Sequence, residues 1–188
     1  NRISSVTSTM KITSAIKMVS AAKLKKAQDA ITAMKPYSEK LNDLMSSFSN
    51  VISSSNISYL ASQRPIKNVL VVVIASNRGF CGAFNSNIVK KSIALKSEDK
   101  FSNAEFNFIV LGKKVHDVLC KTETISQNKS EIFDDLSYDN SSQIIDEITK
   151  DFADEKYDHV QLIYNSFKNA ANQIVKSEQL LPIVNDSE

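Results

Sequence analysis

The first 52 residues hold no glycine and only one proline, Pro36, and this constrains the fold more than any other feature of the chain. Apolar and small residues recur there at alternating spacings of three and four, the seven-residue period of a coiled-coil helix. Eleven of the fifteen positions in this seam are apolar. The positions are Ile3, Val6, Met10, Thr13, Lys17, Ser20, Leu24, Ala27, Ile31, Met34, Ser38, Leu41, Met45, Phe48 and Ile52. We predict one long helix over this stretch.

The length of this helix predicts that it extends beyond the rest of the protein. At about 1.5 Å per residue it would be roughly 75 Å long, whereas the remaining residues would form a domain with a radius of gyration of about 14 Å. A projecting apolar seam needs a partner, and no second seam of comparable length follows in the sequence. The alternative is a helix that folds back on its own domain as a hairpin. Because proline removes a backbone donor, we expect a kink near residues 32–36.

Charge is distributed unevenly between the helix and the remainder of the chain. Residues 1–60 carry a net charge of +5 and the remainder −3, and no acidic residue precedes Asp29. Such an asymmetry predicts an acidic partner, which can be protein, nucleic acid or lipid headgroups. The lysines lack the interleaved aromatic residues of a nucleic-acid binder, and they interrupt the apolar face that a membrane-surface helix needs. We therefore favour a ring of acidic protein subunits around the helix and rank a coiled-coil nucleic-acid binder last.

The pattern beyond the helix is that of a small α/β domain. A serine-rich stretch over residues 53–64 ends before Pro65 and predicts a linker, with a domain boundary near residue 60. Strand and helix patterns then alternate, which predicts a Rossmann-like, doubly wound fold with four or five mostly parallel strands. The apolar run Val69–Ile74 is typical of a strand that is buried on both faces.

The expected elements of this domain follow from their apolar periods and turn residues. We expect strands at residues 67–76, 105–111, about 124–126, 159–165 and 174–184, with Pro182 marking a strand end or an edge strand. We expect helices from Gly82 or Ala83 to about Lys96, from Gly112 to about Lys121, and at Ser142–Ala153. The last helix should be capped by Asn140–Ser141 and should share one apolar face among Ile144, Ile145, Ile148 and Phe152.

The turn Ser76–Asn85 follows the first buried strand, where a glycine-rich turn can cradle a phosphate at a helix N-terminus. Its two glycines, Gly79 and Gly82, fall short of the G-x-G-x-x-G fingerprint, and no G-K-[ST] pattern occurs in the chain. We interpret them as residues that allow a tight turn and close packing of the helix on the strand. Arg78 is then a structural or interface residue rather than an anion ligand. The alternative function is a nucleotide-binding α/β enzyme with a helical oligomerisation arm.

No residue set in the chain predicts catalysis, a metal site or a cofactor. His116 and His159 are isolated, Cys81 and Cys120 form no metal or redox motif, and Asp134–Asp135 lies in a polar loop. No apolar run is long enough for a transmembrane helix, and the N-terminus lacks the apolar core of a signal peptide. Because the chain starts with Asn and ends abruptly, we expect it to be trimmed or incomplete.

Two motifs resemble those of one known family. Residues Ile12–Leu24, followed by Ala27–Asp29, resemble the N-terminal signature of the γ subunit of F-type ATP synthases. Residues Ser76–Asn87 resemble the second signature of the same subunit, with Phe80 where leucine is usual. The motifs stand in the family's order, about sixty residues apart, and the resemblance covers nearly the whole chain. The residues of both motifs are closer to bacterial than to mitochondrial members.

The resemblance implies a non-catalytic rotor subunit of the central stalk of F1, which couples proton flow to ATP synthesis on the β subunits by rotation. It implies α and β subunits in a hexameric ring, an ε subunit and the membrane c-ring as partners, with no nucleic acid and no cofactor. It also implies that residues 1–60 form half of the antiparallel shaft with a linker, and residues 61–188 the α/β domain. We expect the pairing C-terminal helix to be absent from this chain.

The resemblance also assigns interface residues and a location. Facing the acidic lever region of the β subunits would be Arg2, Lys17, Met18, Lys23, Lys25 and Lys26. The signature turn of the α/β domain would comprise Arg78, Gly79, Cys81 and Gly82. The implied location is the cytoplasmic side of the bacterial inner membrane, where the subunit is peripheral. The alternative is the matrix side of the mitochondrial inner membrane.

Overall fold

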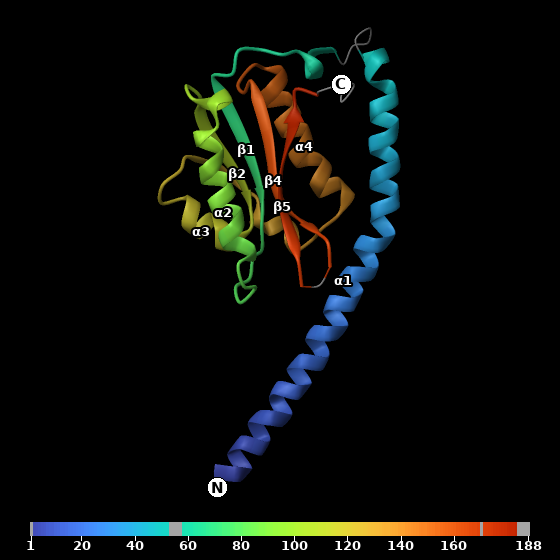
Figure 1. The fold of residues 1–188 in the computed structure, drawn as a ribbon, viewed down its shortest axis with the longest axis vertical. Coiled ribbons are helices and arrows are strands. Elements are labelled where there is room, and N and C mark those ends of the chain that lie inside the picture. The colour runs from blue at the N-terminus through green and yellow to red at the C-terminus, as the bar shows by residue number, and fades with distance from the viewer. Residues whose placement is uncertain (1, 53–57, 170, 184–188) are drawn as a thin grey trace. The chain divides into compact units, whose positions relative to one another are not determined.

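The computed structural model describes residues 2–52, 58–169 and 171–183. Contacts within the chain divide it into two units, with the division between Asn50 and Val51. Within the described residues, the first unit is helix α1 (Arg2–Ile52) without its last two residues. The second is an α/β domain built on a five-stranded sheet (Figure 1). The predicted fold class is therefore confirmed, whereas the projection of α1 from the domain stays a prediction.

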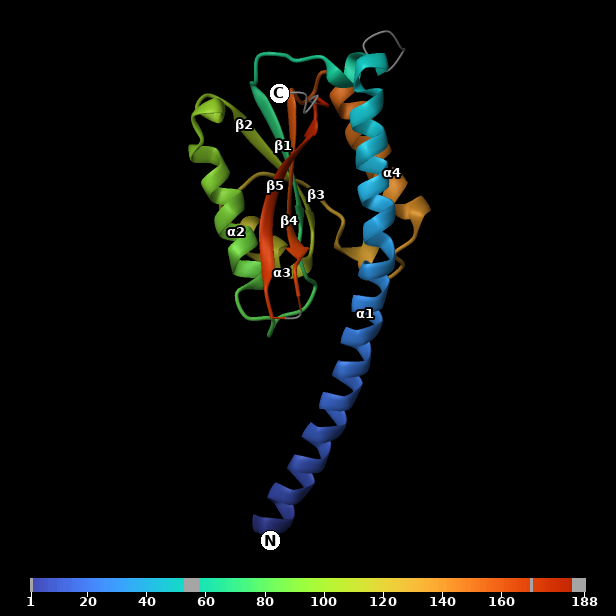
Figure 2. The same ribbon diagram turned by 45° about the vertical axis from the view of Figure 1, so that its right-hand side comes forward.

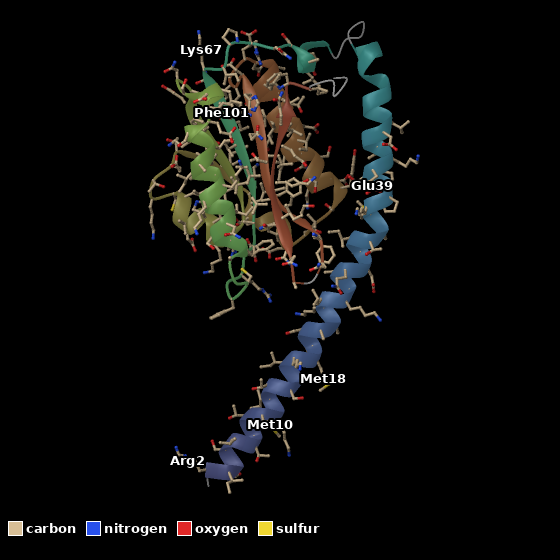
Figure 3. The ribbon with its side chains drawn as sticks, viewed as in Figure 1. Arg2, Met10, Met18, Glu39, Lys67 and Phe101 are labelled. Atoms are coloured by element: carbon tan, nitrogen blue, oxygen red, sulfur yellow. The ribbon has the colours of Figure 1, made fainter. Side chains whose placement is uncertain are left out.

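Helix α1 is 51 residues long and runs unbroken through Pro36, as its lack of glycine predicted. Its axis bends between the labelled residues Met18 and Glu39 (Figure 3). Pro36 has no N–H to donate to the carbonyl of Thr32. The Thr32 hydroxyl in turn donates to the Gln28 carbonyl at 2.8 Å, a bond that favours helix bending. The bend therefore lies in the interval that contains the expected kink.

The apolar seam of α1 is open to solvent. Every side chain that the structure describes in this helix is exposed except that of Gln28, which is half-buried. Ile3 at the N-terminal end is 84% exposed and Leu41 is 43% exposed. Within the described side chains, the seam therefore has no partner. The side chains of the last three seam positions, Met45, Phe48 and Ile52, lie outside the described ones.

The domain contains one mixed sheet with the strand order β3-β2-β1-β4-β5. Strands β3, β2, β1 and β4 are parallel, and β5 pairs antiparallel with β4 at one edge. In chain order the elements are β1 (Asn68–Ile74), α2 (Phe84–Ala94), β2 (Glu105–Leu111), α3 (Lys113–Leu119), β3 (Ile125–Asn128), α4 (Tyr138–Ala153), β4 (His159–Phe167) and β5 (Gln173–Leu181). Short 3-10 turns occupy Ser58–Ala61 (η1), Leu95–Ser97 (η2), Asp99–Phe101 (η3) and Ser130–Phe133 (η4).

Helices cover both faces of the sheet, with α2 and α3 on one side and α4 on the other (Figures 1 and 2). The apolar run of β1 explains this arrangement, because all residues from Val69 to Val73 are at most 4% exposed. Its odd-numbered valines join a core cluster with Ile88 and Leu119, and Leu70 and Val72 join a second cluster with residues of α4. Each large side chain buried in this way contributes roughly 1.5–3 kcal/mol.

Two expectations for α4 are wrong. The helix begins at Tyr138, and its N-cap is Ser137 rather than Asn140–Ser141. Ser137 has extended dihedral angles, and its side chain accepts a hydrogen bond from the Asn140 N–H at 3.3 Å. Ile145 also leaves the expected face and is 48% exposed, because it lies about 100° around the helix from Ile144.

The remaining boundaries differ by a few residues from those expected. Strand β3 runs two residues further than predicted, and β5 is an edge strand that ends just before Pro182. Residues 53–57 of the expected linker, and Val184, lie outside the described residues. Segment η1, which follows them, packs on the domain, where the Ile183 N–H donates to the Leu60 carbonyl at 2.8 Å.

Candidate interaction surfaces and the signature turn

The basic N-terminal half of α1 is the first candidate surface. Each of the residues predicted there is exposed, namely Arg2, Lys17, Met18, Lys23, Lys25 and Lys26. Within the described part of the chain, the ion pairs of α1 lie further along, at Lys35–Glu39 and Lys40–Asp43. At 3.6 residues per turn, the last three lysines of the set point in different directions around the axis. The positive charge is therefore distributed around the helix axis rather than along one side of the helix.

One face of α1 near its N-terminus carries mainly small side chains. It is lined by Ser5, Val6, Thr9, Met10, Thr13, Ser14 and Lys17. The hydroxyl groups of Thr9 and Thr13 donate to the carbonyl four residues earlier, at 3.0 and 2.9 Å. These hydroxyls are satisfied within the helix, so the face lets another chain approach closely without demanding fixed hydrogen-bond partners.

The signature turn connects β1 to α2 and is the second candidate surface. Arg78, Gly79, Cys81 and Gly82 are all exposed. Phe80 and Gly82 both have a φ of 58°, in the left-handed region that disfavours a residue with a side chain such as phenylalanine. The Phe80 side chain is fully exposed as well. The turn thus holds a large apolar side chain in solvent on a strained backbone.

The interpretation that both glycines permit close packing is wrong. A Cβ atom added at Gly79 or Gly82 would meet nothing within 4 Å. Gly82 is required for its positive φ, whereas Gly79 has neither a positive φ nor a close neighbour. Close approach occurs instead at Gly112, where an added Cβ would lie 2.8 Å from the carbonyl carbon of Ala75.

Asn85 fixes the conformation of the turn. Its side-chain oxygen accepts a hydrogen bond from the Ser76 N–H at 3.1 Å, and its amide nitrogen donates to the Arg78 carbonyl at 3.2 Å. The Ser76 hydroxyl accepts from the Arg78 N–H at 3.0 Å. Side chains of the turn itself therefore satisfy two of the N–H groups that a phosphate-binding loop would offer to its ligand.

Asn77 connects the turn to the ends of two other parallel strands. Its amide nitrogen donates to the Ser130 carbonyl at 2.9 Å, and its oxygen accepts from the Lys113 N–H at 2.9 Å. Sequence reasoning missed the roles of Asn77 and Asn85, since the partners of Asn77 lie 53 and 36 residues away in the chain. The available signal was a polar amide side chain placed directly after a buried strand.

The other candidate residues remain separate in the structure. His116 lies on α3 and His159 opens β4, where it is buried with its Nε2 atom 2.8 Å from Gln161 Oε1. Burial lowers the pKa of His159 from its ordinary value, against the opposing effect of the Gln161 hydrogen bond. Cys81 and Cys120 are free and exposed. Among the described residues, no three His, Cys, Asp or Glu side chains are grouped to hold a metal ion.

A cationic helix whose described side chains are almost all exposed, in one chain with an α/β domain, is typical of a subunit that contacts other chains. Comparison with known proteins identifies the family. The family model described as ATP synthase matches residues 1–188, and the chain belongs to this family.

Bacterial γ chains are similar to this protein over nearly its whole length. The ATP synthase gamma chains of Christiangramia forsetii and Flavobacterium psychrophilum are both 51% identical over 183 residues, which is 97% of this chain. The chain spans 64% and 63% of their lengths, just under two thirds. The predicted resemblance to the γ subunit is confirmed.

A solved structure shares the fold. The structure described as the central stalk and c-ring of the Tetrahymena thermophila mitochondrial ATP synthase is 27% identical, with a TM-score of 0.63. The match covers 91% of this chain and 72% of that one. Within the described residues, no helix has both the length and the apolar character needed to cross a membrane.

Proposed function

We propose that this chain is the rotor subunit of the central stalk of F1 in a proton-transporting ATP synthase. It carries no active site of its own and couples proton flow to ATP synthesis on the β subunits by rotation. The observation that carries this proposal is α1, a helix of 51 residues whose described side chains are almost all exposed and which has no acidic residue before Asp29. Its relatives are ATP synthase gamma chains, which supports the same role.

The distribution of positive charge around the axis of α1 suits a helix that turns inside a ring. Lysine is a compact point charge without the rigid fork of arginine, so it attracts a carboxylate without imposing one geometry. Lysines that point in several directions, such as Lys23, Lys25 and Lys26, present charge to acidic β-subunit levers at successive rotor angles. The small-residue face near the N-terminus offers few large side chains that could pack between those of the ring subunits.

The bend of α1 supplies the asymmetry that rotary coupling requires. A straight, uniform rod would contact each β subunit alike at every angle. A bent helix presses on the ring unequally, and its rotation favours a different nucleotide affinity at each β subunit in turn. Such a change is a coupling free energy between distant sites. The bend between Met18 and Glu39 lies on the helix that carries the basic residues (Figure 3).

The other parts of the chain and its partners follow from the same role. Residues 1–60 form one half of the shaft with its linker, and residues 61–188 form the α/β domain. The α and β subunits surround the shaft, and the ε subunit and the c-ring contact the foot of the stalk. The subunit is attached to the cytoplasmic side of the bacterial inner membrane through the complex. The signature turn from Arg78 to Gly82 belongs to the interface of the domain.

Charge reversal in the assembled complex tests the proposal. The variant K23E/K25E/K26E is expected to reduce ATP-driven proton pumping in reconstituted vesicles several-fold relative to ATP hydrolysis. A matched control, K90E/K113E/K121E, reverses three exposed lysines of the α/β domain and is expected to pump nearly normally. Unchanged pumping in the α1 variant would contradict the proposal.

Nucleotide titration separates this function from a nucleotide-binding enzyme. We expect the isolated chain to bind neither ATP, NAD nor FMN at micromolar concentration, because side chains of the turn satisfy the Ser76 and Arg78 N–H groups. Micromolar binding that is lost when Gly79 and Gly82 are replaced would favour the enzyme.

A further inference from the structure

A second exposed apolar surface lies on the α/β domain, between η4 and the start of α4. Phe133, Leu136 and Tyr138 are 39%, 70% and 84% exposed. Single exposed apolar side chains are common on protein surfaces, whereas several close together mark interaction sites. We refer to residues 131–139 as the docking segment.

The backbone of the docking segment is held in place by its own hydrogen bonds. The Asn140 side chain donates to the Asp135 carbonyl at 2.8 Å and to the Asp135 carboxylate at 3.2 Å. The Ser137 hydroxyl accepts from the Asn140 N–H, and the Asp134 N–H donates to the Glu131 carbonyl at 2.9 Å. A surface ordered in this way loses little conformational entropy when a partner binds.

The charge of the docking segment determines the chemistry of its partner. It contains Glu131, Asp134, Asp135 and Asp139, all exposed, and no basic residue occurs from position 130 to position 149. Lys129, which precedes this stretch, already pairs with Glu147 at 2.9 Å. Phosphate groups of nucleic acids and anionic lipids are repelled by such a surface, whereas a cationic protein segment is attracted.

A hollow of about 260 Å³ lies beside the docking segment. Its lining includes three carboxylate residues, Glu131, Asp135 and Glu147, and one cation, Lys129, which already pairs with Glu147. Guanidinium and ammonium groups carry only hydrogen-bond donors and a positive charge, so a lining with more carboxylates than cations suits them. The hollow therefore fits the end of an arginine or lysine side chain.

We propose that the docking segment binds a segment of another protein chain that is rich in arginine or lysine. One cationic side chain enters the hollow, and apolar side chains of the partner cover Leu136 and Tyr138. This inference rests on the proposed rotor function, since the partner is a subunit that turns together with this chain. A stationary partner would have to withdraw its side chain from the hollow at every step of rotation.

Site-specific photo-crosslinking in the purified ATP synthase complex tests this inference. Tyr138 is replaced by p-benzoylphenylalanine, and the crosslinked peptides are identified by mass spectrometry after illumination. We expect a crosslink to an arginine- or lysine-rich segment of a different subunit. We also expect the crosslinked complex to retain ATP hydrolysis, because the two chains rotate together.

Charge variants in the same background provide the control. The pair D134K/D135K is expected to lower the crosslink yield by at least about tenfold, because like charges oppose each other across the interface. The pair D99K/D154K makes the same charge change at exposed positions elsewhere on the domain and should leave the yield unchanged. An equal loss in both pairs would overturn the charge argument.

The remaining outcomes separate this inference from the proposed function. A crosslink to α1 of the same chain, to lipid or to an acidic segment overturns it, as does the absence of a crosslink to another chain. Loss of ATP hydrolysis on crosslinking would identify a stationary partner and would also overturn it. If proton pumping by the uncrosslinked complex is normal in these cases, the rotor function stands and only the docking proposal fails.

Discussion

Arg64 and Asp158 form an ion pair between the segments that lead into β1 and β4. Their Nε and Oδ1 atoms are 3.9 Å apart, and the two side chains are only 19% and 12% exposed. The other carboxylate oxygen of Asp158 accepts hydrogen bonds from the N–H groups of Lys67 and Asn68, both at 3.0 Å. The Arg64 guanidinium also lies 4.4 Å from the centre of the Phe152 ring. This pair therefore fixes the starting ends of two neighbouring strands.

Removal of the Asp158 carboxylate should destabilise the domain. Asp158→Ala leaves the Lys67 and Asn68 N–H groups without their acceptor. It also removes one carboxylate from beside the Arg64 guanidinium, which still donates to the Phe152 and Tyr157 carbonyls. The two changes together should cost about 3 kcal/mol in the free energy of unfolding. Urea unfolding followed by circular dichroism measures this change. The control is Glu155→Ala, since Glu155 pairs with the same arginine but is 77% exposed. That substitution should cost less than about 1 kcal/mol, and a similarly small cost for Asp158→Ala would contradict a structural role for this carboxylate.

Two glycine substitutions should differ sharply in their effects on stability. Gly112 has a φ of 143°, and an added Cβ would lie 2.8 Å from the carbonyl carbon of Ala75. Gly112→Ala should therefore lower the free energy of unfolding by about 2 kcal/mol or more. Gly79→Ala meets no neighbour within 4 Å and should change it by less than about 0.5 kcal/mol. Equal costs in thermal unfolding would show that the backbone around Gly112 accommodates a side chain without strain.

The buried imidazole of His159 should make stability depend on pH. Burial lowers the pKa of His159 in the folded protein, so below pH 6.5 the unfolded chain binds the proton more readily. The contribution of His159 is fully present above that pH and is lost as the pH falls below it. Chemical unfolding at pH 7.5, 6.5 and 5.5 measures the effect. In His159→Gln the slope over this interval should flatten, and an unchanged slope would assign it to other groups.

Local sequence signals predicted most of the fold because they act over short distances along the chain. The run from Val69 to Ile74 identified the central strand, and the absence of glycine before Ile52 identified α1. The predicted start of α4 lies too far along the chain, because Ser137 and Asn140 are both good capping residues. The choice between them depends on Asp135, whose backbone carbonyl binds the Asn140 side chain.

The candidate surfaces were less predictable from sequence, because they depend on contacts between distant residues. Composition revealed the basic stretch that contains Lys23, and α1 exposes it as expected. In contrast, the left-handed conformation of Phe80 and the bonds from Asn77 to Ser130 and Lys113 exist only once the strands are aligned. The exposure of Leu136 likewise depends on how the helices pack on the two faces of the sheet, which is set by contacts between distant residues.

Loss of the Asn85 side chain should loosen the signature turn while the domain stays folded. Asn85→Ala removes the acceptor of the Ser76 N–H and the donor to the Arg78 carbonyl. Each such bond contributes about 1 kcal/mol, so hydrogen exchange of amides in the turn should accelerate by roughly tenfold. The control Asn87→Ala alters an exposed amide two residues further along α2 and should leave exchange in the turn unchanged. Comparable protection of the turn in both variants would mean that the backbone alone holds Phe80 in solvent. Acceleration confined to Asn85→Ala would show instead that the Asn85 side chain holds the turn in this conformation.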